Sequence, residues 1–514
     1  MLENIYMFAY IAVMIFGGSW FVLKDRNLST KVSSWGFWSS ILTYVLTLLL
    51  DDGSLIFKFL WVLPRDLALF VLVILFINKY VKLPKVLTFG IIGIIGFFNF
   101  FYANYMQQSF SQNFDDINVS FFSQKATLDQ NAELLFDIKN PADLEKIRQI
   151  LKPYQTTIEL ALPELQNADF SELDDYYTVN ISDKFSDKIE EITKKLLESG
   201  LVDAVEENEI MSLDFKEGKD VEANKPSFGL NDPEIAKQWA FEKMRVGEFY
   251  QIIRQKNIRP VKKAKIAILD TGIDSQHEDL QKNYKSTETQ YDSDKLGHGT
   301  HCAGIAAAVS NNAKGIASIV PNSDFVEVTS IKVLNDSGFG TQLGILKGIV
   351  KAADQGAAVI SMSLGGPSND AAQRAYNQAV MYAKKAGAIV VVAAGNSNEN
   401  AKDFSPANVD GVIVVSAIDE NLGKASFSNY ISDLKMGIAA PGVNIFSTYP
   451  NNTYKSLNGT SMATPYVAGL LGFMKSVNPD LSTEKAYEIL QKTGIDTKDT
   501  KATGKFIQAD AVLK

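Results

Sequence analysis

Four polar residues in the C-terminal half of the chain have the side chains that acyl transfer needs: Asp270, His298, Asn396 and Ser461. A serine hydroxyl is a weak nucleophile until a base accepts its proton, and the histidine imidazole titrates in the right pH range. A carboxylate holds the imidazole in the correct tautomer and stabilises its transient positive charge. An asparagine amide donates a hydrogen bond to the oxyanion that develops on the attacked carbonyl group. These residue types therefore predict a serine hydrolase.

Short apolar runs precede several of these residues and predict the elements that position them. The runs are β-branched and continuous, which is typical of strands buried on both faces: KIAILD, AVISMSL, AIVVVAA and GVIVVSA. They alternate with helical stretches from about residue 231 onward, so we expect an α/β fold in which helices cover a parallel sheet. Asp270 ends the first run and Asn396 follows the third. Active residues of such sheets lie beyond the carboxyl ends of the strands, so we expect these side chains to converge.

Five short motifs surround the polar residues: DTGID, HGTHCAG, SMSLGG, AAGN and GTSMATP. The set and the Asp, His, Ser order resemble those of the subtilisin-like serine proteases, or subtilases, over about residues 231–514. The resemblance implies a subtilisin-like catalytic domain in which Asp270 orients His298 and His298 is the general base. It further implies that Ser461 is the nucleophile. Asn396 and the backbone N–H of Ser461 would then stabilise the oxyanion.

The same resemblance implies two binding features. The residues that would pair with the backbone of a peptide substrate, as an added strand, are Ser363, Leu364 and Gly365. Three residues resemble the side-chain ligands of a calcium site of the family: Asp232, Asp279 and Asn312. Backbone carbonyl groups would complete the calcium shell. The calcium would be structural, and no cofactor is expected for catalysis.

The other histidines and the single cysteine favour packing over metal binding. His301 lies three residues after His298, but the sequence contains no HExxH motif. The chain offers only His277 and Cys302 as further histidine or cysteine ligands. We expect His301 and Cys302 to be buried near the base and His277 to lie in a loop.

A second pattern precedes the protease-like region, in residues 132–214. It predicts a strand over 132–139, a helix over 141–154, two more strands, a helix over 187–200 and a last strand over 201–213. This β-α-β-β-α-β order indicates a ferredoxin-like α+β domain. The family resemblance implies a prodomain that inhibits the protease and is cut between about residues 209 and 230, so the chain would be a zymogen. The alternative is an independent sensor or binding domain.

The first 105 residues predict an all-α transmembrane region. Four apolar runs, at 5–23, 33–50, about 59–78 and about 86–104, approach the roughly 20 residues that a membrane-spanning helix needs. Lysine and arginine follow the first and third runs, whereas aspartate follows the second. Basic loops stay cytoplasmic, so the protease-like domain would lie on the extracellular or periplasmic side. Polar residues 106–131 are expected to form a linker.

The net charge and the cysteine count of the chain limit the partners and the covalent links that we expect. The net charge of −9 argues against a nucleic-acid partner, and a single cysteine excludes an intrachain disulfide. The favoured interpretation is a membrane-anchored, autoprocessed serine endopeptidase. Its partners would be protein or peptide substrates, the lipid bilayer and its own prodomain. The alternative is a non-catalytic receptor or scaffold that binds peptides through a protease-like domain.

Overall fold

The computed structural model describes residues 128–219, 228–368 and 373–514. None of the helices in these ranges is both long enough and apolar enough to cross a membrane. The four predicted spans (1–105) and most of the predicted linker (106–131) lie outside the described residues, so both remain predictions.

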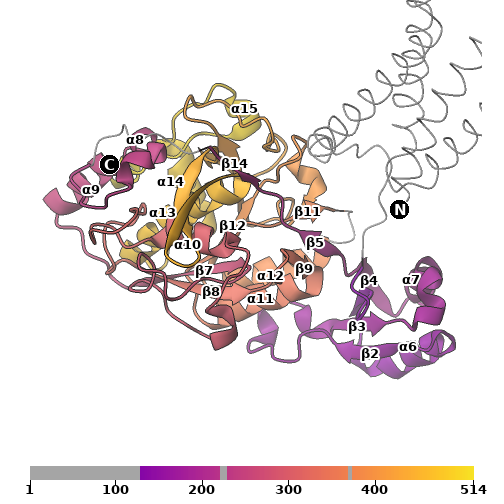
Figure 1. The fold of residues 1–514 in the computed structure, drawn as a ribbon. Helices are drawn as coiled ribbons and strands as arrows, with labels where there is room; N and C mark the ends of the chain where they lie inside the picture. The colour runs from indigo at the N-terminus through magenta and orange to yellow at the C-terminus, as the bar shows by residue number, and fades with distance from the viewer. Residues whose placement is uncertain (1–127, 220–227, 369–372) are drawn as a thin grey trace, which may run out of the picture. The chain divides into compact units, whose positions relative to one another are not determined.

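A six-stranded parallel sheet forms the centre of residues 228–514, which we call the sheet unit (Figure 1). The strands, in the spatial order β15-β14-β12-β10-β7-β8, are β15 (Gly437–Pro441), β14 (Val412–Ile418), β12 (Ile389–Ala393), β10 (Val359–Met362), β7 (Ala264–Asp270) and β8 (Val326–Lys332). In the register of the centre, Val359 lies opposite Ile266 on one side and Ile389 on the other. The predicted parallel sheet is confirmed, and the four predicted strands are β7, β10, β12 and β14.

Helices cover both faces of this sheet, because neighbouring residues of each strand point to opposite sides. In β7, Ile266 and Ile268 belong to one buried apolar cluster, whereas Ala267 and Leu269 belong to the other. The first cluster includes residues of α8 (Trp239–Lys243), α9 (Val246–Gln255), α10 (His298–Ala307), α13 (Thr460–Val477) and α14 (Thr483–Thr493). The second includes residues of α11 (Gln342–Asp354) and α12 (Gln373–Lys385). A short helix, α15 (Thr500–Thr503), lies near the C-terminus.

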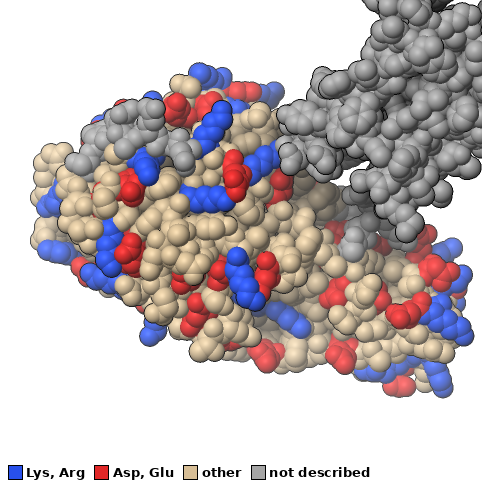
Figure 2. Space-filling view, viewed as in Figure 1, with Lys and Arg blue, Asp and Glu red and all other residues tan. Residues whose placement is uncertain are grey.

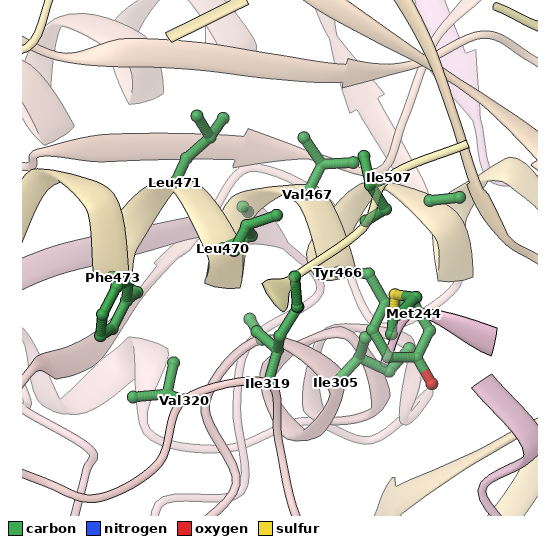
Figure 3. Packing of buried hydrophobic residues seen from close by; sticks show 14 of the residues in the cluster. Met244, Ile305, Ile319, Val320, Tyr466, Val467, Leu470, Leu471, Phe473 and Ile507 are labelled. Carbon is green, nitrogen blue, oxygen red and sulfur yellow. The ribbon is translucent and has the colours of Figure 1, made fainter. Parts of the chain in front are cut away.

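Helix α13 is a core helix, and every residue from Thr460 to Ser476 is buried. Figure 3 shows its side chains Tyr466 and Leu470 among apolar neighbours that include Ile305 of α10. A helix with apolar side chains on all sides belongs in an interior rather than at a surface. The residues at its start are therefore held by close packing along the whole helix.

Residues 128–207 form a second sheet, which we call the upstream unit. Its elements are β1 (Leu134–Ile138), α6 (Leu144–Leu151), β2 (Thr157–Leu160), β3 (Tyr176–Asn180), α7 (Ile189–Glu198) and β4 (Val202–Glu207). The strands are antiparallel, in the spatial order β2-β3-β1-β4. Ile147 of α6 and Ile192 of α7 face a core that these elements share. The element order is the predicted β-α-β-β-α-β.

The last strand predicted for this unit, over 201–213, is wrong in its extent. Strand β4 ends at Glu207, and a separate strand β5 (Ile210–Ser212) pairs with β9 (Phe339–Thr341) of the sheet unit. The side chain of Asn208 separates the two strands, because its amide donates to the Ala132 carbonyl (2.8 Å) and its Oδ1 accepts from the Leu343 amide (3.0 Å). Asn208 therefore bonds to both units at the point where the chain passes from β4 to β5.

Residues 208–219, here called the junction segment, continue along the sheet unit as an added strand. After β5, the short strand β6 (Lys216–Glu217) joins β17 (Thr453–Asn458), which in turn pairs with β16 (Ile445–Tyr449). Another short antiparallel pair consists of β11 (Gly366–Pro367) and β13 (Phe404–Ser405). The junction segment therefore makes backbone pairs on two different strands of the sheet unit.

Charged side chains of both signs mix on the described surface that Figure 2 shows. Lysine and arginine alternate with aspartate and glutamate there, and uncharged surface separates them. This face offers no broad basic area of the kind that a nucleic-acid backbone requires.

Candidate active site

Asp270 and His298 form a buried pair where two elements meet. Asp270 is the last residue of β7, and His298 is the first residue of α10. The Nδ1 atom of His298 lies 2.8 Å from Oδ1 and 2.9 Å from Oδ2 of Asp270, and both side chains are fully buried. The carboxylate therefore holds the proton on Nδ1. The other nitrogen, Nε2, is buried and has no hydrogen-bond partner among the described residues.

The charge of this pair sets the basicity of the imidazole. Burial of His298 opposes protonation, but the carboxylate of Asp270 outweighs burial and raises the pKa of His298 well above its ordinary value of 6.5. The Sγ atom of Cys302 lies 4.0 Å from Nδ1 of His298. Burial also raises the pKa of the Cys302 thiol, so the thiol stays neutral beside the base.

A second carboxylate, Asp294, fixes the start of α10. It accepts hydrogen bonds from the backbone N–H groups of Gly297 (2.8 Å) and Thr300 (2.9 Å), and thus caps the free donors of the first turn. It also accepts from the hydroxyl of Thr271 (2.9 Å), in the loop that follows β7. At Gly299, an added Cβ would lie only 2.1 Å from the carbonyl oxygen of Gly272. The helix start therefore packs directly on this loop, which places the base against its acid.

Ser461 is the second residue of α13, next to the strand end of β10. Its hydroxyl donates to the carbonyl of Ser363 at 3.1 Å, and the hydroxyl of Ser363 donates to the carbonyl of Ser461 at 2.8 Å. The Sγ atom of Cys302 also lies 3.5 Å from the carbonyl of Ser461. These contacts bring the start of α13 beside α10, with the Ser461 hydroxyl directed at Ser363 rather than at the imidazole.

Asn396 follows β12 and has its amide fixed by the start of α13. Its Oδ1 accepts from the backbone N–H and from the hydroxyl of Thr460, both at 2.9 Å. The Nδ2 group is thereby aimed away from α13, and it donates to the carbonyl oxygen of Asp214. A Cβ added at Gly459 would lie 3.6 Å from this Nδ2. A larger side chain there would crowd the position of the carbonyl group.

The junction segment crosses these residues without a break. Before Asp214, Met211 of β5 pairs with Gly340 of β9, and the Leu213 N–H donates to the Gly338 carbonyl at 3.0 Å. After Asp214, the ring of Phe215 lies 4.7 Å from the imidazole of His298, measured between centroids. An extended peptide therefore passes over the base with one carbonyl group on the Asn396 amide.

Comparison with known proteins gives the family. The profile of the subtilase family matches residues 261–508. Thermitase from Thermoactinomyces vulgaris is 43% identical over 262 residues, which are 50% of this chain and 88% of thermitase. Subtilisin DY from Bacillus licheniformis is 44% identical over 248 residues, 47% of this chain and 87% of that protein. This chain belongs to the subtilase family.

The chain is accordingly a serine-type endopeptidase, which is a hydrolase. Subtilisin Savinase from Lederbergia lenta is 40% identical over 257 residues, 49% of this chain and 90% of that protein. A solved protease structure from Pseudoalteromonas arctica aligns with 28% identity and a TM-score of 0.49, and covers 55% of this chain and 98% of that one.

Strand β9 of this subtilase, which pairs with the junction segment, was not predicted from the sequence. The backbone ladder runs between β5 and β9. The pairing of a substrate with Ser363, Leu364 and Gly365 stays a prediction. Gly366 directly follows these positions and lies near the junction segment. A Cβ added at Gly366 would be 3.8 Å from the Cγ atom of Met211. The signal for β9 is the glycine pair in SGFGT, directly after the loop that follows β8. Gly340 has no room for a side chain, because a Cβ would lie 2.4 Å from the Val333 carbonyl oxygen.

The structure brings the three predicted calcium residues of this subtilase together. Asp232 accepts from the backbone N–H groups of Asn311 (2.8 Å) and Asn312 (3.1 Å). The side-chain amide of Asn312 lies 2.7 Å from Oδ1 of Asp279. Burial raises the pKa of Asp279 to about 7, and the negative charge of Asp232 adds to this rise. Two buried carboxylates thus lie close enough to repel each other.

The remaining histidines of the subtilase make structural contacts. His301 is fully buried, with Nε2 at 2.9 Å from the Lys455 carbonyl, and burial lowers its pKa to about 3. His277 is also buried, with Nε2 at 3.0 Å from the Thr453 carbonyl, and burial lowers its pKa. Both rings contact β17 of the same unit, although His277 is more buried than its predicted loop position suggested.

Proposed function

We propose that Asp270, His298 and Ser461 hydrolyse peptide bonds through an acyl-enzyme. Ser461 turns its hydroxyl from the Ser363 carbonyl to Nε2 of His298, gives up its proton there and attacks the substrate carbonyl carbon. His298 then protonates the leaving amine, and it later activates the water that releases the acyl group. The observation that carries this proposal is the 2.8 Å pair of His298 and Asp270 with an unpartnered Nε2.

Asn396 supplies the oxyanion donor in this mechanism, together with the backbone N–H of Ser461. The support is that its Nδ2 already donates to a peptide carbonyl that lies across the site. Thr460 fixes the amide before any substrate arrives, so the donor needs no reorganisation as negative charge develops.

Labelling with a fluorophosphonate tests the assignment of the nucleophile. The wild type should be modified at Ser461, whereas Ser461→Ala should take no label. Ser432→Ala, at an exposed serine, is the matched control and should label as the wild type does. A folded wild type that takes no label even after removal of residues 132–214 would contradict the proposed roles and favour the peptide-binding scaffold.

We also propose that residues 132–214 act as a prodomain that inhibits the protease until the chain cuts itself. The support is the path of the junction segment, which passes over His298. An enzyme whose own chain occupies its site cannot bind another peptide there. Conversion of the zymogen would therefore require this unit to leave.

The membrane anchor and the outward orientation are proposals that rest on residues 1–105 of the sequence. Alkaline carbonate extraction should leave the full chain in the membrane fraction. Protease added to intact cells should digest residues 231–514, whereas a cytoplasmic marker should survive. A chain that carbonate releases, or whose protease domain resists external digestion in intact but not in broken cells, would overturn this topology.

The proposed structural calcium fits the residues that the structure brings together. Carboxylate and amide oxygens are the ligands that Ca²⁺ prefers, and a cation would remove the repulsion that raises the pKa of Asp279. Asp232, Asp279 and Asn312 would hold the ion. At a calcium concentration of about 100 Kd, binding would stabilise the fold by about 2.7 kcal/mol.

The melting temperature tests this site. It should fall when a chelator is added to the wild type, and Asp279→Asn should abolish the difference. Asp410→Asn, at an exposed ion pair with Lys435, should leave the chelator effect intact. The same melt with and without excess chelator would refute calcium binding.

A further inference from the structure

The junction segment places the two residues of one specific peptide bond beside Asn396 and His298. Accepting the triad proposed above, we infer that Ser461 cuts its own chain between Asp214 and Phe215. We further infer that residues 215–219 then stay on β17 and occupy the leaving-group side of the site. The processed protease would thus keep a strand of its own where the residues of a substrate after the cut bond must lie.

The carbonyl group at the site identifies the bond. The oxygen of Asp214 accepts from Nδ2 of Asn396, the side chain assigned to the oxyanion. The next residue, Phe215, has its ring 4.7 Å from the ring of His298, so the residue that carries the leaving nitrogen lies beside the base. The acid that protonates a leaving nitrogen must lie on this side.

The register on the acyl side agrees with this assignment. Ile210, Met211 and Ser212 pair with the three residues of β9. The bond from the Leu213 N–H to the Gly338 carbonyl, at 3.0 Å, extends this ladder to the residue before Asp214. A shift by one residue would turn every side chain of the segment to its opposite face. The ladder therefore fixes which carbonyl group reaches Asn396.

The register on the leaving-group side is fixed independently by β17. Glu217 lies opposite Leu457, and its carbonyl accepts from the side-chain amide of Asn458 at 2.9 Å. The carboxylate of Glu217 also forms an ion pair with Lys455. The next residue, Gly218, donates its N–H to the Ser456 carbonyl at 2.8 Å.

These contacts do not depend on the bond between Asp214 and Phe215. Every one of them joins residues 216–219 to the sheet unit, so hydrolysis leaves them intact. Lys219 adds another, since its N–H donates to Oδ1 of Asn444 at 2.9 Å. The strand also remains covalently attached to the sheet unit through residue 228, which keeps its effective concentration high.

The chemistry balances with water as the second reactant. The Ser461 oxygen bonds to the Asp214 carbonyl carbon, and its proton passes through His298 to the Phe215 nitrogen as the C–N bond breaks. Water then adds its hydroxyl to the acyl carbon and returns a proton to the Ser461 oxygen. The products are a new carboxylate at Asp214 and a new amino group at Phe215, with the enzyme unchanged.

N-terminal sequencing of the purified full chain tests the bond. The C-terminal fragment from the wild type should begin with Phe-Lys-Glu-Gly-Lys, and the Ser461→Ala chain should remain uncut. A fragment that begins elsewhere would overturn the inference, even where fluorophosphonate labelling of Ser461 shows that the triad is active. A cut at this bond in Ser461→Ala would overturn it too, because another protease would then be responsible.

The retained strand is tested by Gly218→Val in the processed protease. A Cβ at Gly218 would lie 3.0 Å from the backbone of Ser456, so valine should displace the strand. The retained strand would then no longer compete with a peptide substrate that has several residues after its scissile bond. The KM for such a peptide should fall about three- to tenfold, which corresponds to about 0.7–1.4 kcal/mol of binding free energy. The KM for a short substrate without such residues should stay constant, and so should both values in the exposed control Lys282→Val. An unchanged KM for the long peptide would refute the retained strand.

Discussion

The sheet unit and the upstream unit bury their acidic side chains in different ways. In the sheet unit, Asp270 and Asp294 take their hydrogen bonds from donors of the same unit, within the loops that carry the site. In the upstream unit, Glu206 accepts from the Gln342 amide (2.9 Å) and from the Ala375 N–H (3.0 Å), both in the sheet unit. The sheet unit therefore supplies the donors for these two carboxylates itself. The upstream unit does so for Glu133, which accepts from the Ile181 N–H (2.8 Å), but among the described residues it supplies only the Tyr176 hydroxyl (3.3 Å) to Glu206 and takes the other donors from the contact.

The upstream unit and Asn208 contact the first turns of two helices of the sheet unit, α11 and α12. The Leu343 N–H of α11 donates to Asn208, and the Ala375 N–H of α12 donates to Glu206. The first N–H groups of a helix lack partners within the helix and favour negative charge. Asp137 adds an ion pair with Arg374 at 2.9 Å. The upstream unit thus recognises the protease domain through features of its fold rather than through the triad alone.

The largest expected effect on activity lies in the sheet unit, which supplies its own donors to Asp270 and Asp294. Asp270→Asn keeps the size of the side chain but removes the charge that fixes the tautomer of His298 and stabilises its positive form. The kcat for peptide hydrolysis should fall by about 10⁴-fold. Asp324→Asn, at an exposed position, should leave kcat unchanged. A loss of less than tenfold in Asp270→Asn would contradict the assigned role.

A smaller loss is expected for the oxyanion donor, which is also fixed within the sheet unit. Asn396→Ala removes one donor while the base and nucleophile remain, so kcat should fall by about 10²–10³-fold with little change in KM. Steady-state kinetics on a peptide substrate measures this split. Asn421→Ala, on an exposed loop, serves as the control. A change in KM alone would show that Asn396 binds the ground state instead.

The smallest effect is expected at the contact between the upstream unit and the sheet unit. It is an effect on stability, and it varies with pH. Burial raises the pKa of Glu206 to about 7 from an ordinary 4.5, so the folded state holds a proton that the unfolded chain releases. This stabilisation is complete below pH 4.5 and is lost as the pH rises through about 7. The uncut Ser461→Ala chain should therefore be less stable toward urea at pH 8 than at pH 5.

A double variant isolates the contribution of this carboxyl group. Glu206→Gln stays neutral, so in the Ser461→Ala background it should remove up to about 3 kcal/mol of the pH dependence. Glu190→Gln, at an exposed carboxylate of the same unit, should leave the pH dependence unchanged. Equal pH dependence with and without the Glu206 carboxyl group would mean that protonation of Glu206 is not linked to folding, and the contrast between the two units would lose this support.

The sequence predicted the central strands well, and it missed the edges of the sheet for a physical reason. Strands β7, β10, β12 and β14 are buried on both faces and read as continuous apolar runs. Edge strand β8 includes Glu327 and Lys332, and edge strand β15 begins with Gly437 and ends with Pro441. Their positions come from pairing with a neighbour rather than from their own residue preferences.

The candidate site likewise contains residues that short motifs indicate and a contact between segments far apart in the sequence. Residue types, strand ends and motif order were enough to indicate Asp270, His298, Asn396 and Ser461 as one group. The path of the junction segment was not predictable in this way, because β5 and β9 are separated by more than a hundred residues of chain. Only the docking of two folded units brings Met211 to Gly340, and no short pattern in the sequence encodes that contact.

The two imidazoles of α10 have a consequence for how the protease responds to acid. Burial lowers the pKa of His301 to about 3, so this imidazole stays uncharged around neutral pH. His298, one helical turn away, is the group that gains a positive charge as the solution becomes acidic. Inactivation on the acid side should therefore follow the uptake of one proton, with log(kcat/KM) rising by one for each pH unit, and not the steeper slope of two coupled histidines.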